Sequence, residues 1–139
     1  GKAGELMGQI YEVTVKAGED IKAVVTDYVL GQGWESVYIT GAVGSVIGMS
    51  YTTPVRDQLP LVTASQPAEG AAEVLSLTGE VMKREKMDPA LQSVYKDTEC
   101  PLFVHIHISC AHRDGSVRGG GLAAGNAFRS LRIFMTPLG

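Results

Sequence analysis

The chain has 139 residues and a formal net charge of −3, from 12 Lys and Arg against 15 Asp and Glu. This length is typical of one domain that buries its own hydrophobic core, so we expect a single domain over residues 1–139. The negative charge argues against nucleic-acid binding through phosphate contacts, which needs a positive field, and no apolar run reaches the roughly 18 residues of a membrane helix.

The N-terminal part of the chain is predicted to form one strand followed by one helix. Residues 9–16 alternate between apolar and polar side chains, which is the pattern of a half-buried strand. Residues 19–30 repeat apolar side chains at the spacing of one face of an amphipathic helix. Glu19 and Asp20 would lie in the first turn of this helix, where acidic groups suit the helix dipole, and the glycines that follow it fit its C-terminal end.

The middle of the chain is rich in strand patterns. Residues 34–54 favour β-structure, with glycines that are typical of bulges or close backbone approach. Residues 54–70 carry three prolines and are expected to form a loop, with a short strand at 61–63. Residues 71–82 are predicted to be a strand, and residues 83–99 a polar excursion with weak helical character.

The C-terminal part is predicted to contain the central strand, over residues 100–112. A turn follows at Asp114-Gly115, then a glycine-rich stretch over 118–128 and a final strand over 129–137. Several strands after a single early helix, without β-α-β alternation, indicate an α+β fold with a mostly antiparallel sheet.

Two cysteines, Cys100 and Cys110, flank this central strand. Ten residues of extended chain separate them, so they cannot be bridged within one strand. Free thiols are typical of a reducing compartment, and no signal-peptide pattern opens the sequence. We therefore expect a cytoplasmic protein.

The central strand places two histidines opposite the hydrophobic core. Alternate residues of a strand share a face, so one face would be wholly apolar and would carry Leu102, Val104, Ile106 and Ile108. The other face would carry Phe103, His105, His107 and Ser109. This second face would then lie in a pocket, at a subunit interface or in solvent.

His105 and His107 have a spacing that permits a metal site without requiring one. Their Cα atoms would lie about 6.6 Å apart, close enough for both imidazoles to reach one ion. A stable zinc site needs three or four protein ligands. His112 has the wrong parity and is expected to be an exposed turn residue. Further ligand candidates are Glu73, Glu80 and the two cysteines, and nothing in the sequence selects among them.

Three stretches in order resemble the plants-and-prokaryotes-conserved (PPC) domain: "AGEDI…VYITGAVGSV", "EVLSLTGEV" and "FVHIHISCAHRDGSVRGGGLAAG". The resemblance runs from about Tyr11 to Met135. It implies an α+β domain with an antiparallel sheet that assembles as a homotrimer. Stand-alone prokaryotic members of this family are often labelled predicted DNA-binding proteins.

The resemblance also implies a metal-site variant. Many prokaryotic members carry His-x-His, an acidic-Gly turn and then Gly-Gly-His-Leu, and these three histidines look like metal ligands, as in the similarly folded acetolactate decarboxylases. Here His105 and His107 match the first two, but Gly121 stands where the third histidine would be. The remaining pair would hold zinc weakly unless Glu80, another side chain or a neighbouring subunit contributed a ligand.

The plant members of the family contact partner proteins through a Gly-Arg-Phe-Glu-Ile-Leu segment. The corresponding stretch, Gly70 to Leu75, lacks the Arg and the Phe, and the chain has no AT-hook. That partner function therefore does not transfer to this chain.

The sequence supports two functional hypotheses. The first is a cytoplasmic homotrimeric binding or regulatory module, with a pocket bordered by His105 and His107 that takes a small ligand or a partner protein. The alternative is a metal-dependent lyase or hydrolase in which the two histidines hold zinc and Glu80 serves as third ligand or general base. Direct DNA binding is not expected from the charge.

Overall fold

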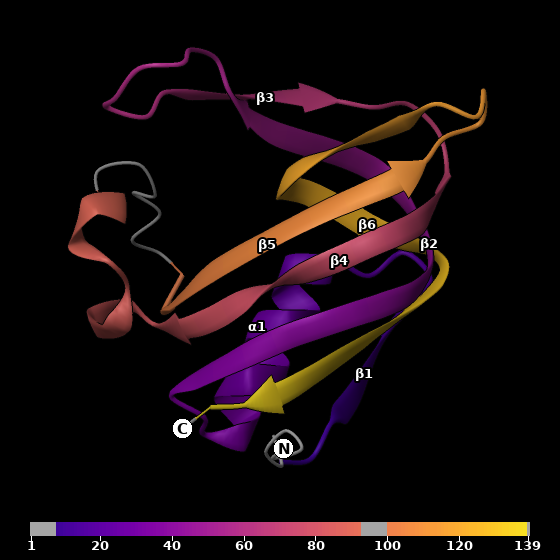
Figure 1. The fold of residues 1–139 in the computed structure, drawn as a ribbon. Coiled ribbons are helices and arrows are strands. Elements are labelled where there is room, and N and C mark those ends of the chain that lie inside the picture. Colours follow the sequence, from indigo (N-terminus) through magenta and orange to yellow (C-terminus); the bar gives the residue numbers. More distant parts are fainter. Residues whose placement is uncertain (1–7, 93–99, 139) are drawn as a thin grey trace, which may run out of the picture.

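The computed structural model describes residues 8–92 and 100–138 as one antiparallel sheet with a helix packed against it (Figure 1). The strands lie in the order β1-β6-β5-β4-β2-β3, and their pairings are antiparallel. This confirms the predicted α+β class with an early helix. The elements are β1 (Tyr11–Lys16), α1 (Ile21–Gln32), β2 (Ser36–Pro54), β3 (Thr63–Pro67), β4 (Ala72–Lys83), two 3-10 turns (Arg84–Lys86 and Pro89–Leu91), β5 (Leu102–Ala111) and β6 (Val117–Pro137).

The sheet closes on itself because β6 pairs with three different strands. It pairs with β1, β5 and β2, while β2 pairs with β4 and β4 with β5. β2 and β6 have 19 and 21 residues, about twice the upper end of the usual strand length of roughly 3–10 residues. Their mutual pairing contains several register shifts, and such bulges bend a strand. Both strands therefore curve around the core, as Figure 1 shows.

The glycine-rich stretch over 118–128 belongs to β6. The final strand, predicted over 129–137, is therefore longer than predicted and starts before these glycines. The glycines serve close packing between strands rather than a loop. A Cβ atom at Gly119 would lie 2.5 Å from the backbone oxygen of Ile108, and one at Gly120 would lie 2.5 Å from that of Thr52. Glycine in a strand often marks such a close approach.

Helix α1 forms where the sequence predicts it, with a correction at its start. Asp20 is the N-cap residue, and its carboxylate accepts a hydrogen bond from the Ala23 N–H at 2.9 Å. Glu19 precedes the helix and accepts a hydrogen bond from the Lys16 N–H, so neither acidic residue lies in the first turn. Gly33 ends the helix with φ of 73°, which is the left-handed conformation of a C-cap glycine.

Two connecting segments differ from the predictions. The short strand expected at 61–63 is β3, which runs from Thr63 to Pro67 and pairs with the end of β2. The excursion expected over 83–99 begins with the two 3-10 turns, while residues 93–99 lie outside the described residues.

The hydrophobic core lies between α1 and the inner face of the curved sheet. Helix α1 contributes one side, with Ile21, Val25 and Val29 fully buried. Trp34, after the helix, packs against the ring of Tyr11 in β1 at a centroid distance of 4.8 Å. The largest fully buried strand residues include Val15, Val37, Ile39, Val46, Met49, Leu77, Leu131, Ile133 and Met135.

We predict that Gly79→Ala lowers the free energy of unfolding by about 1–3 kcal/mol, as overpacking does. A Cβ atom at Gly79 in β4 would collide with the backbone oxygen of His105 and would lie 2.8 Å from the Cα of Ile106. Chemical denaturation monitored by circular dichroism measures the change.

Gly41→Ala is the matched control, because a Cβ atom at Gly41 in β2 meets nothing within 4 Å. This control should change the free energy of unfolding by no more than about 0.5 kcal/mol. Equal effects of the two substitutions would contradict the packing role assigned to Gly79.

Candidate functional site

Strand β5 separates a core face from a polar face as its alternation predicts. Leu102, Ile106 and Ile108 are buried, whereas His107 is exposed and His105 is half-buried. Two residues depart from the prediction. Val104 is half-buried at the margin of the core, and Phe103, on the histidine face, is only 2 % exposed.

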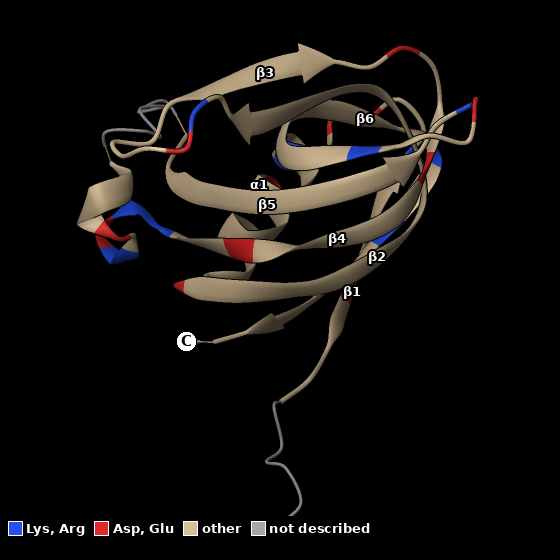
Figure 2. Cartoon of the chain, turned by 45° about the horizontal axis from the view of Figure 1, so that its top comes forward, with Lys and Arg blue, Asp and Glu red and all other residues tan. Residues whose placement is uncertain are grey.

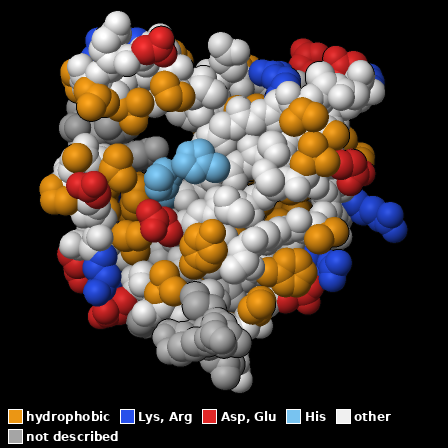
Figure 3. Space-filling view, viewed as in Figure 1, with side chains coloured by type: hydrophobic (Ala, Val, Ile, Leu, Met, Phe, Trp, Pro, Cys, Tyr) orange, Lys and Arg blue, Asp and Glu red, His pale blue; other side chains and the backbone are white. Residues whose placement is uncertain are grey.

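A cavity opens where β6 parts from β5. The two strands pair from His107↔Gly121 to Ala111↔Val117. From Gly121 onward β6 pairs with β2 instead, so the stretch of β5 before His107 has no β6 partner beside it. The cavity at this point has a volume of about 500 Å³ and is lined by Lys22, Thr52, Pro54, Leu61, Thr63, Ser65, Leu91, Val104, His105, Ile106, His107, Gly121, Leu122 and Ala123. Figure 3 shows histidine side chains gathered beside a hollow on this face.

The two predicted histidines lie together, and Glu80 stands next to them. The ring centroids of His105 and His107 are 4.8 Å apart in an edge-to-face arrangement. Glu80 faces His105 in the β4–β5 register, and its Oε1 lies 3.5 Å from His105 Nδ1. The side chains of His105 and Glu80 are 25 % and 44 % exposed, so solvent screens this contact and its contribution to stability is small.

The other predicted ligands do not reach the histidine pair. Glu73 pairs with Ala111 at the far end of β5. Cys110 is fully buried in the core and Cys100 is half-buried, and both thiols are free. Within residues 8–92 and 100–138, no three His, Cys, Asp or Glu side chains lie close enough together to hold a metal ion. The described residues of one chain therefore do not by themselves make up a metal centre.

Gly121 stands directly beside the histidine pair. It is the residue of β6 that faces His107 across the β5–β6 ladder. A Cβ atom at Gly121 would make ordinary van der Waals contacts, the nearest being the Cβ of Thr52 at 3.5 Å. Its φ is not in the left-handed region. Unlike Gly119 and Gly120, this position has room for a side chain.

His107 favours its neutral form. Although His107 is exposed by its total surface, partial desolvation lowers its pKa below the ordinary value, and the neighbouring His105 lowers this pKa further. A neutral imidazole carries one hydrogen-bond donor and one acceptor. His107 can thus both donate a hydrogen bond to a polar ligand and accept one from it.

Lys22 is a cavity residue that the sequence analysis missed. It lies in the first turn of α1 and lines the same cavity as the histidines. The helix pattern places Lys22 on the margin of the buried face, but nothing in the pattern indicates which strand that margin meets. No Asp or Glu lines this cavity among the described residues, so Lys22 gives it a positive character.

His112 lies at the β5–β6 turn as predicted, where its carbonyl accepts a hydrogen bond from the Gly115 N–H. It is half-buried, however, so the prediction that it is exposed was wrong. Its Nε2 atom lies 2.9 Å from the hydroxyl of Tyr51, to which it is hydrogen-bonded. Tyr51 is 3 % exposed and comes from β2, 61 residues away in the chain. His112 belongs to a different surface from His105 and His107.

Comparison with known families identifies the fold over almost the entire chain. The profile of the Plants and Prokaryotes Conserved (PCC) domain matches residues 3–139. No curated protein matches the chain. In addition, no helix among the described residues is long and apolar enough to cross a membrane.

Several solved structures share this fold. A plant- and prokaryote-conserved protein from Pyrococcus horikoshii is 22 % identical with a TM-score of 0.70, covering 95 % of this chain and 80 % of its own. A metal-containing protein from Archaeoglobus fulgidus is 24 % identical with a TM-score of 0.72, covering 98 % and 84 %. A protein from Bacteroides thetaiotaomicron, described as a putative DNA-binding protein, is 15 % identical with a TM-score of 0.72, covering 96 % and 82 %.

We predict that His107 titrates below its ordinary pKa of 6.5 and that His105→Gln raises the pKa of His107 part of the way back. The rise is partial because burial, the larger cause, remains. As the pH falls, the unfolded chain protonates His107 before the folded chain does, because the pKa of His107 is lower in the folded state. The stability contributed by His107 is therefore complete at neutral pH and is lost as the pH falls below 6.5. Proton NMR titration of the imidazole signals measures both pKa values.

His112→Gln is the control for this titration, because His112 is not among the causes of the His107 shift. It should leave the pKa of His107 unchanged. The partial burial of His107 beside His105 would be contradicted if the pKa of His107 were not lowered, or if both substitutions changed this pKa equally.

Proposed function

The chain belongs to the Plants and Prokaryotes Conserved domain family, and on this premise we propose that it is a binding module whose cavity beside His105 and His107 takes a small polar ligand. The observation that carries the proposal is the cavity of about 500 Å³ at the point where β6 leaves β5. Ligand sites are typically concave, with a few convergent polar groups in an apolar lining. Leucine and valine side chains supply the apolar part of this lining.

The polar groups of the cavity favour a ligand with acceptor oxygens. They are the Lys22 ammonium, the two imidazoles, the hydroxyl of Thr63, and the hydroxyls of Thr52 and Ser65, which are hydrogen-bonded to each other at 2.7 Å. Each can donate a hydrogen bond. A panel of small carboxylic acids is therefore the first probe, with the NMR signals of His105 and His107 as the readout. The proposal fails if no member of the panel shifts these signals. It also fails if isothermal titration shows that His105→Ala/His107→Ala binds the acid as tightly as the wild type.

We also propose that the module assembles as a homotrimer. The support is the number of large apolar side chains that the outer surface of the sheet exposes, and apolar patches on a protein surface mark interaction sites. Tyr38 and Val43 of β2 are 45 % and 54 % exposed, and Leu75 of β4 is 57 % exposed. Closed rotational symmetry is the usual solution for identical chains.

We predict that light scattering at micromolar concentration gives three times the mass of one chain. Leu75→Glu should lower this mass, because it would place a carboxylate in the apolar contact, and Thr78→Glu in the same strand tests whether any new charge does so. A monomeric wild-type chain would end the trimer proposal.

A metal-dependent lyase or hydrolase is the second candidate. The position of Glu80 beside His105 favours it, and a relative of this fold is a metal-containing protein. Against it stands the absence of a three-ligand group among the described residues. Elemental analysis of protein purified without chelators separates the candidates, since a metal content near zero rejects the enzyme.

We predict that Gly121→His raises the affinity for zinc by at least about tenfold, because a third imidazole completes the usual protein ligand number of an open zinc site. The position faces His107 and has room for a side chain. Isothermal titration with a zinc salt measures the affinity.

Gly121→His combined with His107→Ala is the matched control, since it keeps the new residue and returns the number of histidines to two. This control should bind zinc about as weakly as the wild type. Equal affinities of Gly121→His and the wild type would show that position 121 does not belong to the same site.

Direct DNA binding is not proposed for this chain. The net charge is −3, and the cartoon in Figure 2 shows Lys and Arg positions scattered among Asp and Glu positions along the described chain. Binding to a phosphate backbone draws on clustered Lys and Arg.

A further inference from the structure

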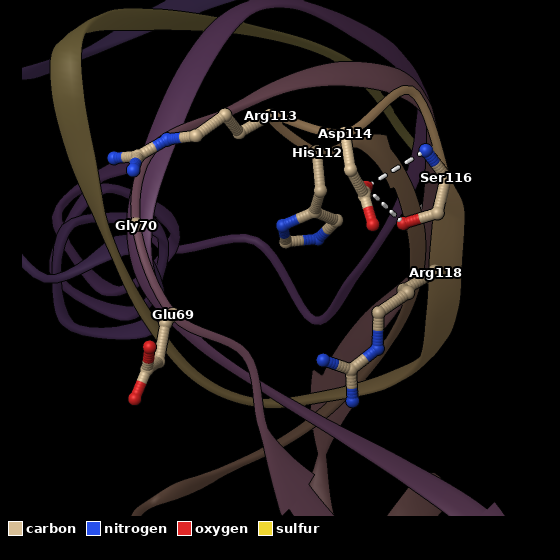
Figure 4. A pocket seen from close by; sticks show the side chains of 7 residues that line it. All are labelled: Glu69, Gly70, His112, Arg113, Asp114, Ser116 and Arg118. Atoms are coloured by element: carbon tan, nitrogen blue, oxygen red, sulfur yellow. Dashed lines mark hydrogen bonds between the residues drawn. The ribbon is translucent and has the colours of Figure 1, made fainter.

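A second pocket lies at the other end of β5, away from the histidine pair. It has a volume of about 410 Å³ and lies around the turn between β5 and β6, where Figure 4 shows its side chains. Its lining consists of Glu69, Gly70, His112, Arg113, Asp114, Ser116 and Arg118. None of these residues lines the cavity beside His105 and His107. The proposed function does not use this pocket.

The two arginine side chains of this pocket make few polar contacts with the rest of the described chain. Among the described residues, Arg113 forms no hydrogen bond or ion pair. Its guanidinium extends over the backbone at Gly70, with one nitrogen 3.7 Å from where a Cβ atom of residue 70 would stand. Arg118 reaches the Pro67 carbonyl at a long 3.5 Å. Figure 4 places the two guanidinium groups on opposite sides of the His112 ring.

Tyr51 holds two of these side chains in place from the core. Its hydroxyl is hydrogen-bonded to Nε2 of His112 at 2.9 Å, which leaves Nδ1 of His112 without a partner among the described residues. The guanidinium carbon of Arg118 lies 5.8 Å from the centre of the Tyr51 ring, within the range of a cation–π contact. One buried ring therefore orients both an imidazole and a guanidinium toward the pocket.

The two carboxylates at the rim do not neutralise this arrangement. Asp114 Oδ1 accepts hydrogen bonds from the backbone N–H and the hydroxyl of Ser116, at 3.0 and 2.6 Å. Asp114 is thus committed to the turn. Glu69 is exposed, and its carboxylate points away from the His112 ring in Figure 4. Neither carboxylate forms an ion pair with Arg113 or Arg118 among the described residues.

We propose that this pocket binds a phosphate monoester of a small metabolite. Arginine is the side chain best suited to phosphate, because its planar fork can donate two parallel hydrogen bonds to the oxygens. The volume of the pocket falls within the usual range of roughly 300–1,000 Å³ for ligand sites, which leaves space beyond a single phosphate group for the rest of a small ester.

The test uses the full chain at fixed ionic strength, with inorganic phosphate, glycerol 3-phosphate and adenosine monophosphate as probes. Binding is followed by isothermal titration and by the NMR signals of His112. We expect saturable binding, tighter for at least one ester than for inorganic phosphate. Arg113→Gln/Arg118→Gln should weaken the binding by at least about tenfold, since each substitution removes charge-assisted hydrogen bonds.

Arg56→Gln/Arg132→Gln is the matched control, because it removes the same charge from residues that do not line the pocket. It should keep the wild-type affinity. Tyr51→Phe should weaken binding less than the double arginine variant, because it keeps the ring beneath Arg118 and loses the hydroxyl that orients His112. Glu69→Gln should tighten binding, because it removes a negative charge from the rim.

Three results would overturn the proposal. They are the absence of saturable binding of all three probes, equal weakening by the two double arginine variants, and binding that shifts the signals of His105 and His107 but not those of His112. Circular dichroism of each variant identifies any loss of fold. If the double arginine variant does not fold, the single Arg113→Gln variant replaces it, because the side chain of Arg113 is exposed and contributes no core contact.

Discussion

The structure depends on one constraint of the backbone: β6 must pair with β5 at one end and with β2 along most of its length. The two pairings meet at Gly121, which pairs with His107 of β5 and with Thr52 of β2. Glycines at 119 and 120 permit the close approach of the strands just before this point, because a Cβ atom at either position would lie 2.5 Å from a backbone oxygen. The cavity beside His105 and His107 is the space that this departure leaves. The same geometry that closes the sheet thus creates the candidate site.

The parts of this arrangement with a local cause could be predicted from the sequence. The faces of β5 follow from strict alternation, and helix α1 follows from apolar spacing, so both were predicted close to their observed bounds. The length of β6 could not be predicted, because glycines in a strand look the same as glycines in a loop when the neighbouring backbone is unknown. The burial of His112 could not be predicted for a related reason. Its partner Tyr51 comes from a strand 61 residues away, and Lys22 likewise reaches the cavity from a distant helix.

The two ends of β5 offer different chemistry to a ligand. At the histidine end the polar groups are two imidazoles and one ammonium in a partly apolar cavity, and burial keeps His107 neutral by lowering its pKa. At the turn end, two guanidinium groups keep their charge at any physiological pH. Tyr51 stays protonated there, because burial raises its pKa and its contact with Cys110 adds to the rise. His107 therefore becomes charged only as the pH falls below 6.5, whereas the second site holds a constant positive charge.

The neutral state of His107 bears on the choice between a binding module and an enzyme. A neutral imidazole is the form that ligates a metal, and it is equally the form that hydrogen-bonds an uncharged group. The pKa is therefore compatible with both functions, and the number of ligands decides between them. Glu80 already interacts with Nδ1 of His105, and such carboxylate contacts commonly orient a metal-bound histidine from outside the coordination sphere. If Glu80 has that orienting role, it is not available as a third ligand. Among the described residues, Gly121 then leaves the pair with two imidazole nitrogens, fewer than the three or four protein ligands of a usual zinc site.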